Sequence, residues 1–201
     1  MKLKGVNLME VGTLEIDVGG MFAEKSTSLI RKGKRHILAG RNVVFLKPKK
    51  DDRYGDEIVA THDGRVHKAL NINYEITDDQ EWITDFVIFP EVEQADVVCI
   101  DEVQFFPYAF IELVDELIYK GKKVYLAGLD LDRFGNPFGV VPALMAKAEH
   151  VEKHHAVCGF CGNDAWVSIG SDDLKNDDQV NVGNDYIPAC RSCAYEKGGV
   201  K

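Results

Sequence analysis

The first two-thirds of the chain alternates short apolar runs with segments of helical periodicity. The runs TLEIDV (13–18), NVVFL (42–46), DVVCI (96–100) and KKVYLAGL (122–129) are apolar nearly throughout, as is typical of strands buried on both faces. Helical spacing follows at 26–40 and 108–122, and an amphipathic helix is expected over 142–154. Strand, helix and strand in succession predict an α/β fold, a parallel sheet flanked by helices with right-handed crossovers.

The chain changes character from about Val157. Turn-forming Gly, Asn and Asp dominate, and two C-x-x-C pairs bracket the segment as VCGFC and ACRSC. Two such pairs with a medium gap make a tetrahedral four-thiolate site, which leaves no open coordination position and so predicts structural Zn²⁺. The expected ligands are Cys158, Cys161, Cys190 and Cys193. We therefore expect two domains, residues 1–152 and a small zinc-binding domain over 153–201.

Composition limits the compartment and the partners. The net charge of −9 argues against a general grip on nucleic acid, which needs a basic face. No apolar run approaches the length of a membrane span, and no apolar signal region precedes Glu10. The paired cysteines then fit metal binding in a reducing compartment better than disulfides, which predicts a cytoplasmic location. Cys99 lies in an apolar run and is expected to be a buried core thiol.

The stretch GGMFAEKST, residues 19–27, joins the first strand to the first helix. A phosphate-binding P-loop reads G-x-x-x-x-G-K-[ST]. Gly19, Lys25 and Ser26 are in register with it, but Glu24 stands where the second glycine belongs. The alternative is an ordinary strand-to-helix turn.

Two acids follow the third apolar run, in DVVCIDEVQFF. Asp101 is expected at the carboxyl end of a strand, where a P-loop enzyme places a carboxylate beside Mg²⁺. Glu102 would point elsewhere and could accept a proton from an incoming hydroxyl. The alternative is a strand end with solvated acids. The polar stretch 47–67 is expected to form a mobile loop or a loose hairpin.

With these motifs on view, nearly the whole chain resembles the type II thymidine kinases, the deoxynucleoside kinases with a zinc-bearing lasso. The resemblance is carried by five segments in order, of which Met21-Phe22 and Gln104-Phe105-Phe106 are not general P-loop features. The segments are GGMFAEKSTSLIRKGKRHILAGRNVVFLKP, DDRYGDEIVATHDG, IDEVQFFP, GLDLDRFGNPFG and VCGFCG…VGNDYIPACRSC.

The resemblance implies an ATP-dependent thymidine kinase that makes dTMP and ADP for DNA precursor synthesis. Lys25 and the loop backbone would hold the ATP phosphates, and Ser26 and Asp101 would hold Mg²⁺. Glu102 would be the general base for the 5′-hydroxyl, and Arg53, with Asp51 in the same segment, would approach the phosphates. The implied ATP and Mg²⁺ set is Gly19, Gly20, Met21, Phe22, Ala23, Glu24, Lys25, Ser26, Thr27, Asp101 and Arg53.

The resemblance also implies a nucleoside pocket closed by the lasso. Its lining would be Met21, Gln104, Phe105, Leu129, Phe138, Ser168 and Tyr186, with backbone groups around Val180, Val182 and Gly183 pairing with the thymine edge. For Leu129 and Phe138, ordinary core packing is an equally open alternative. The family further implies thymidine and ATP as partners, feedback inhibition by thymidine triphosphate, a homotetramer, and neither nucleic acid nor membrane as a partner.

The sequence departs from the family pattern at two places. Arg133 and Phe134 are exchanged relative to D-x-D-F-R-G-x-P-F, which puts contacts carried over from either position in doubt. Glu24 removes a glycine's backbone freedom and adds a charge, worth about 4 kcal/mol of repulsion at ~4 Å from a phosphate oxygen. An outward side chain, a partner such as Lys32 or Arg35, or a position beside the metal would reduce this cost.

Three functions therefore stay open. The favoured one is an active thymidine kinase. The second is a weakened or silent relative that binds nucleosides or nucleotides without turnover, for which Glu24 is the whole case. The third is a zinc-ribbon binding module, such as a nucleic-acid factor, fused to an unrelated nucleotide-binding domain, which the acidic charge disfavours.

Overall fold

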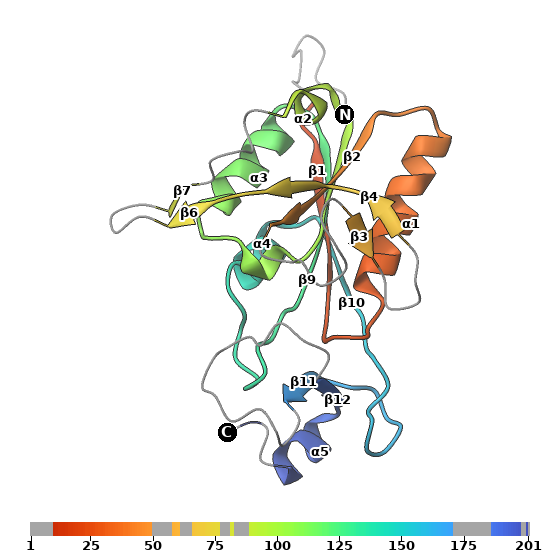
Figure 1. The fold of residues 1–201 in the computed structure, drawn as a ribbon, viewed down its shortest axis with the longest axis vertical. Coiled ribbons are helices and arrows are strands. Elements are labelled where there is room, and N and C mark those ends of the chain that lie inside the picture. The colour runs from red at the N-terminus through yellow and green to blue at the C-terminus, as the bar shows by residue number, and fades with distance from the viewer. Residues whose placement is uncertain are drawn as a thin grey trace, which may run out of the picture.

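A six-stranded parallel sheet forms the centre of the molecule (Figure 1). The computed structural model describes residues 10–49, 58–60, 66–76, 81–82, 89–170, 186–197 and 200. The strand order is β10-β1-β9-β8-β2-β5. The strands are β1 (Thr13–Val18), β2 (Val43–Pro48), β5 (Leu70–Ile72), β8 (Val97–Ile100), β9 (Lys123–Gly128) and β10 (His150–Lys153). The predicted parallel α/β sheet is confirmed.

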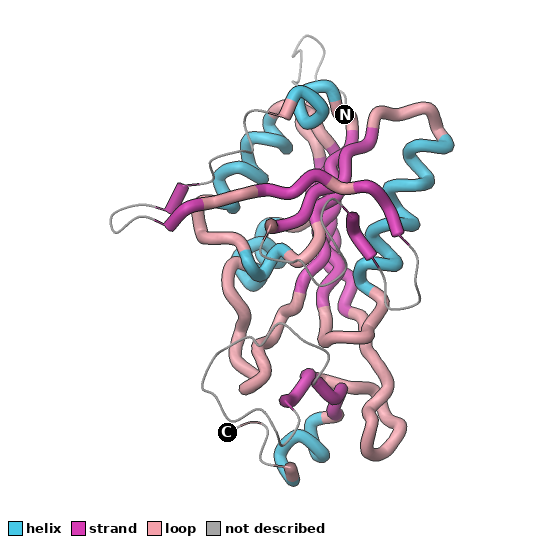
Figure 2. The backbone as a smooth tube through the Cα atoms, in the orientation of Figure 1, coloured by secondary structure: helices cyan, strands magenta, loops and turns pink. Residues whose placement is uncertain are grey.

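Helices cover both faces of this sheet, as the tube in Figure 2 shows. On one face, α1 (Lys25–Leu38) packs through Leu29 and Ile30 against Phe45, Cys99 and Tyr125. On the other, α3 (Phe110–Tyr119) and α4 (Val141–Lys147) bury Phe110, Val114, Leu117, Val141 and Leu144 against the alternate strand residues. Successive side chains of a strand point to opposite faces, and helices cover both faces of this sheet. Most strand residues are therefore apolar, and the strands read as nearly continuous hydrophobic runs.

Two predictions for individual elements are wrong or incomplete. The helix expected over 142–154 ends at Lys147, and His150–Lys153 form β10, which pairs with β1 at the sheet edge. Residues 47–67 are not all loop, because Lys47 and Pro48 belong to β2 and Lys47 is 1% exposed. The hairpin part of that prediction holds, since β3 (Ile58–Ala60) pairs antiparallel with β4 (Val66–Lys68).

A small module follows β10. In it, β11 (Val167–Gly170) pairs antiparallel with β12 (Tyr186–Ala189), which leads into α5 (Arg191–Glu196). Figure 1 places this module beyond the carboxyl ends of β1 and β9. The remaining described elements are α2 (Pro90–Gln94), the 3₁₀ turn η2 (Val103–Phe105) and the strand pair β6 (Glu75–Ile76) and β7 (Glu81–Trp82). The division of the chain at residue 152 stays a prediction.

A charge network centred on the buried Asp17 joins β1, α1 and the segment 152–154 at the end of β10. Asp17 of β1 is 1% exposed and accepts hydrogen bonds from Lys32 Nζ at 3.0 Å on each carboxylate oxygen and from Ser28 Oγ at 3.2 Å. His154 Nε2 lies 2.8 Å from Asp17 Oδ1, and Glu152 lies 3.6 Å from the lysine. Asp17, Glu152 and His154 are close enough together to hold a metal ion. Here the Lys32 ammonium supplies the positive charge beside them instead.

Removing Lys32 is expected to destabilise the fold strongly. In Lys32→Met the Asp17 carboxylate stays buried without its main counter-charge, which costs about 3 kcal/mol and lowers Tm by roughly 6–12 °C. Thermal unfolding followed by circular dichroism measures this. Lys34→Met is the matched control, because Lys34 is exposed on the same helix. A Tm change no larger than that of the control would contradict the interpretation.

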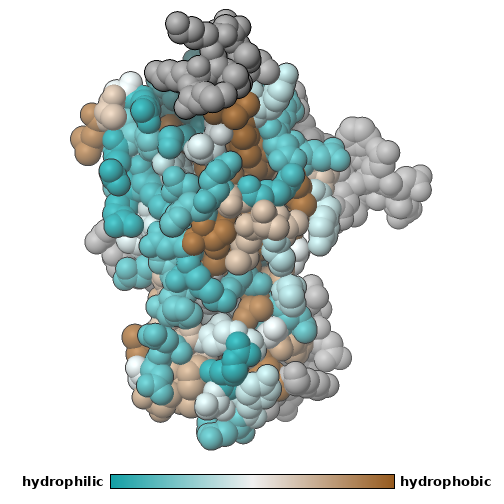
Figure 3. Space-filling model, turned by 180° about the vertical axis from the view of Figure 1, so that it is seen from behind, coloured by the Kyte–Doolittle hydropathy of each residue, from teal (hydrophilic) through white to brown (hydrophobic). Residues whose placement is uncertain are grey.

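The face drawn in Figure 3 is mainly hydrophilic, with a brown strip in its upper and middle part and smaller brown and tan patches at the left edge and in the lower part. Among the described helices, none is long and apolar enough to cross a membrane.

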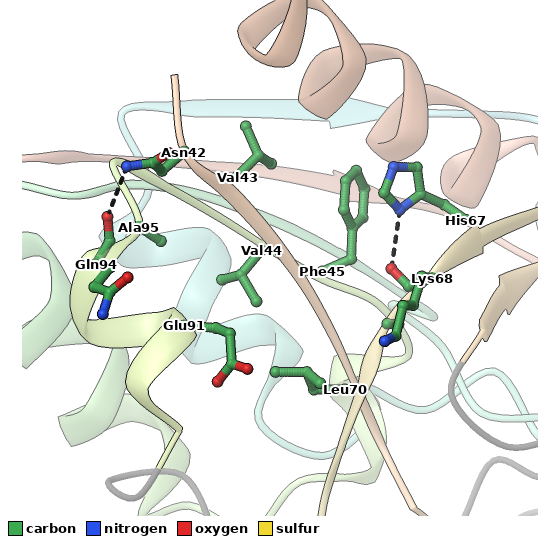
Figure 4. Close-up of a pocket in the computed structure, with 11 residues that line it drawn as sticks. Asn42, Val43, Val44, Phe45, His67, Lys68, Leu70, Glu91, Gln94 and Ala95 are labelled. Carbon is green, nitrogen blue, oxygen red and sulfur yellow. Dashed lines mark hydrogen bonds between the residues drawn. The ribbon is translucent and has the colours of Figure 1, made fainter. Parts of the chain in front are cut away.

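A cavity of about 390 Å³ lies at the start of β2, away from the phosphate loop (Figure 4). Its walls come from the first residues of β2, from the end of β4 and from α2, with Phe45, His67 and Glu91 among them. The rings of Phe45 and His67 lie 4.1 Å apart between centroids. The cavity lies at the amino-terminal end of β2. It is therefore separate from the carboxyl ends of the strands, where Lys25, Asp101 and Glu102 lie.

Candidate active site

The loop between β1 and α1, which the sequence predicts to bind phosphate, contains three residues at positive φ. Gly19 has φ of 140°, and Phe22 and Glu24 have φ of 64° and 60°, so all three residues adopt positive φ. Lys25 begins α1, is 9% exposed, and donates from Nζ to the Gly20 carbonyl at 2.7 Å. The Lys25 side chain is therefore folded back over the loop, which is the position that its predicted role in phosphate binding requires.

Glu24 occupies a left-handed position that favours glycine. Its φ and ψ are 60° and 23°, and it caps the start of α1 without a side-chain hydrogen bond to the helix. A non-glycine residue held in this region costs on the order of 1–2 kcal/mol. Its side chain is exposed, so the outward orientation is the one found. A pairing with Lys32 is wrong, because Lys32 is bound to Asp17.

The acids after β8 lie beside the start of α1. Asp101 is 5% exposed, and the nearby Ser26 side chain and Lys25 charge both act to lower its pKa. The Glu102 backbone N–H donates to Asp101 Oδ1 at 2.9 Å, and Glu102 itself has φ of 54°. This left-handed residue turns the chain, so that the two neighbouring carboxylates point differently. Lys25, Ser26, Asp101 and Glu102 thus converge at the carboxyl edge of the sheet.

The donor set at this edge fits a divalent cation. Burial, and next the charge of Glu102, raise the pKa of Asp101 to about 7, against the weaker effects of Ser26 and Lys25. Carboxylate and hydroxyl oxygens are the ligands that Mg²⁺ prefers. Asp101 and Glu102 together carry more negative charge than the nearby Lys25 balances. A divalent cation would neutralise the remainder.

Binding of Mg-ADP is expected to release a proton near neutral pH. The pKa of Asp101 is raised in the free protein, so at pH 6 most of the population carries a proton that a metal ligand must lose. Calorimetry in buffers of different ionisation enthalpy measures the release, which should approach one proton at pH 6 and vanish above pH 8. Asp101→Asn should release none at either pH. Equal release by wild type and variant would contradict this assignment.

Most of the described residues predicted for the nucleoside pocket contact another member of the set. Met21 is buried, and its N–H donates to Ser168 Oγ at 2.8 Å. Gln104 donates from Nε2 to Glu102 Oε2 and accepts from the Leu129 N–H at 3.0 Å, so its side chain joins the acid to the end of β9.

The aromatic residues predicted for the pocket are Phe105, Phe138 and Tyr186. Phe105 and Phe138 meet edge to face at 6.2 Å, and Phe138 and Tyr186 are buried. For Leu129, the structure gives a half-buried residue at the end of β9 rather than a core position. The predictions for Asp51, Arg53, Val180, Val182 and Gly183 lie outside the described residues.

Arg133 and Phe134, whose order is exchanged relative to the family pattern, form a cation–π contact. The Arg133 guanidinium lies 4.7 Å from the Phe134 ring centroid. The turn around them is organised by Asp132, which is 2% exposed and accepts from the backbone N–H groups of Phe134 and Asn136 at 2.9 Å. Arg133 and Phe134 therefore contact each other within a turn that Asp132 organises.

Four cysteine thiols meet in the small module. The sulfur atoms of Cys158, Cys161, Cys190 and Cys193 all lie within 4.8 Å of one another, and those of Cys161 and Cys190 are 3.6 Å apart. A tetrahedral zinc ion with Zn–S bonds of about 2.3 Å needs sulfurs roughly 3.8 Å apart, so the set fits this metal. Burial raises the pKa of Cys158, but backbone N–H groups of Cys190, Phe160 and Cys161 outweigh it and lower that pKa to about 6.

Sequence reasoning missed several contacts around the site. These are the network of Asp17 with Lys32 and His154, the bridging amide of Gln104 and the Ser168–Met21 hydrogen bond. The signal for the first was available: Leu14, Ile16 and Val18 alternate with Glu15 and Asp17, which places two acids on one buried face of β1. The other two join distant segments and had no local signal.

Together the fold and the site define an α/β protein with a six-stranded parallel sheet and a cluster of four cysteines that could hold a metal ion. A family model described as thymidine kinase matches residues 12–194. The chain therefore belongs to the thymidine kinase family, and this membership implies a kinase.

Proposed function

We propose that the protein transfers the γ-phosphate of ATP to the 5′-hydroxyl of deoxythymidine, giving dTMP and ADP for DNA precursor synthesis. The observation that carries the proposal is the convergence of Lys25, Ser26, Asp101 and Glu102 in a chain of this family. Phosphoryl transfer depends mostly on positioning and charge neutralisation, and this set supplies both.

Each residue has a separate role in the proposed reaction. The loop backbone and Lys25 bind the ATP phosphates. Glu102 accepts the 5′-hydroxyl proton while the bond from O5′ to the γ-phosphorus forms and the bond to the β-phosphate oxygen breaks. Gln104 donates to Glu102 and so holds its carboxylate in place. Ser26 and Asp101 would hold Mg²⁺, which neutralises phosphate charge when bound.

The rest of the proposal concerns the module and the assembly. Residues 1–152 would form the kinase domain, and residues 153–201 would close over the nucleoside around structural Zn²⁺. Met21, Phe105, Phe138, Ser168 and Tyr186 would contact the nucleoside, with Gln104 and Leu129 beside them. A homotetramer, feedback inhibition by thymidine triphosphate and a cytoplasmic location, with neither nucleic acid nor membrane as a partner, stay predictions from the family resemblance.

A magnesium-dependent phosphorylation screen tests the function. Purified protein with ATP and Mg²⁺ is offered each deoxynucleoside, and ADP release is measured. We expect turnover with thymidine, with none when Mg²⁺ is withheld. Absence of ADP release with all the nucleosides would refute the kinase proposal.

Glu24 favours a second candidate, a relative with weakened or no catalysis. Its charge opposes phosphate binding, and its left-handed backbone strains the loop that would bind phosphate. Because the side chain is exposed and screened by water, its repulsion should be below about 1 kcal/mol, well under the value for a buried contact. We therefore favour an active enzyme with reduced ATP affinity.

Replacing Glu24 with glycine is expected to lower the ATP KM about three- to tenfold. The change removes the backbone strain, on the order of 1 kcal/mol, and the nearby charge. Steady-state kinetics of Glu24→Gly, Glu24→Gln and Glu24→Ala separate these effects, since only glycine relieves the strain. If Glu24→Gly changes neither KM nor kcat, this account of the residue is wrong.

A further inference from the structure

A buried hydrogen bond joins the predicted phosphate loop, residues 19–24, to the cysteine module. Met21 N–H donates to Ser168 Oγ at 2.8 Å, and these residues are 147 positions apart in the chain. Ser168 is 9% exposed and lies on β11, opposite Pro188 on β12. A Cβ on Gly20 would lie 3.1 Å from the same hydroxyl, so the loop backbone approaches it closely.

A second contact lies beside the first cysteine pair. Ala23 of the loop packs with Ala156 and Ala165, and all three are 4–6% exposed. Ala165 N–H donates to the Ala156 carbonyl at 2.7 Å, closing the ribbon that carries Cys158 and Cys161. The metal-binding ribbon and the loop therefore share a small apolar core.

The start of the loop is also held. A Cβ on Gly19 would lie 2.2 Å from the His154 carbonyl oxygen, and His154 N–H donates to the Val18 carbonyl at 2.8 Å. The segment that leads from β10 into the module therefore runs against the first residue of the loop.

The loop needs such support because its backbone is strained. Phe22 and Glu24 are non-glycine residues at φ of 64° and 60°. Residues in this region keep their conformation only where the surroundings impose it. The hydrogen bond at Met21 and the alanine contact at Ala23 fall on either side of Phe22, and the second lies next to Glu24.

We propose that the cysteine module acts as a support for the phosphate loop, with Ser168 as the positioning residue. The inference rests on the proposed function, in which this loop binds nucleotide phosphates. Ser168 thereby affects phosphate binding without touching phosphate, in addition to its predicted place beside the nucleoside.

The test measures binding of Mg-ADP in the absence of nucleoside, by calorimetry, for wild type, Ser168→Ala and two controls. Without the hydroxyl the Met21 N–H loses its partner and the loop its anchor, so Kd for Mg-ADP should rise about tenfold. Ser168→Thr retains a hydroxyl and should stay within threefold of wild type. Ser192→Ala changes an exposed serine of the same module and should have no effect.

The possible results separate this inference from the proposed function. Wild-type protein that binds no Mg-ADP refutes the proposed function, and this inference with it. If wild type binds and Ser168→Ala binds equally well, only this inference is refuted. If Ser168→Ala is too unstable to purify, Ala165→Val takes its place in the test. The larger side chain crowds the core that Ala165 shares with Ala23 and Ala156. That variant should also weaken Mg-ADP binding, and unchanged binding would overturn the proposal.

Discussion

Glu102→Gln is expected to lower kcat by at least about a hundredfold and to leave Mg-ADP binding within threefold of wild type. A general base contributes on the order of 10²- to 10⁴-fold to rate. The glutamine amide cannot accept the 5′-hydroxyl proton, but its oxygen can still accept the hydrogen bond that Gln104 donates to Glu102. The geometry around the substitution is therefore retained while the proton acceptor is lost.

Steady-state ADP release and Mg-ADP calorimetry on the same preparation measure the two effects. Glu112→Gln is the matched control, because Glu112 is exposed on α3 and should retain full activity. If Glu102→Gln keeps kcat within a factor of three, Glu102 is not the base. If it instead loses Mg-ADP binding with kcat, the residue acts on the nucleotide site as a whole.

Loss of one cysteine ligand is expected to remove the metal and destabilise the small module. Structural zinc in small motifs contributes about 10–16 kcal/mol of apparent binding free energy, of which a part becomes folding stability. A loss of ~4 kcal/mol would lower Tm by roughly 8–16 °C. Cys161→Ser is the informative change, because Cys161 is exposed and its replacement leaves the core packing intact.

Metal content by mass spectrometry and Tm together test this prediction. Wild type should carry one zinc per chain, Cys161→Ser much less, and chelator-treated wild type should match the variant. Cys99→Ala is the control, since this buried thiol packs beneath α1 and should keep the metal. A Cys161→Ser protein with full zinc, or a Tm insensitive to the chelator, would contradict the assignment.

Elements whose signal is local were predictable from sequence. The largely apolar runs became β1, β2, β8 and β9, because a strand buried on both faces is rich in apolar residues. The two edge strands were not predicted. β10 has the sequence HVEK, which reads as the end of an amphipathic helix, and only its pairing with β1 makes it a strand. Pairing partners lie far away in sequence, so no local pattern encodes them.

The site divides in the same way. Asp101 and Glu102 could be assigned from their place after a buried strand, and the four cysteines from their spacing. That Glu24 points outward, that Lys32 serves Asp17 and that Gln104 holds Glu102 could not. These outcomes depend on backbone conformation and on side chains that meet only after folding.

By itself the sequence determined the class of fold, the chemistry of the metal-binding thiols and the set of charged groups available to a phosphate. Tertiary structure alone decided that Ser168 lies beneath Met21 and that Ala23 meets Ala156 and Ala165. The physical reason is the distance along the sequence over which each kind of signal acts. Hydrophobic periodicity and ligand spacing act within a few residues, whereas a hydrogen bond across 147 positions exists only when the sheet and the module have folded against each other.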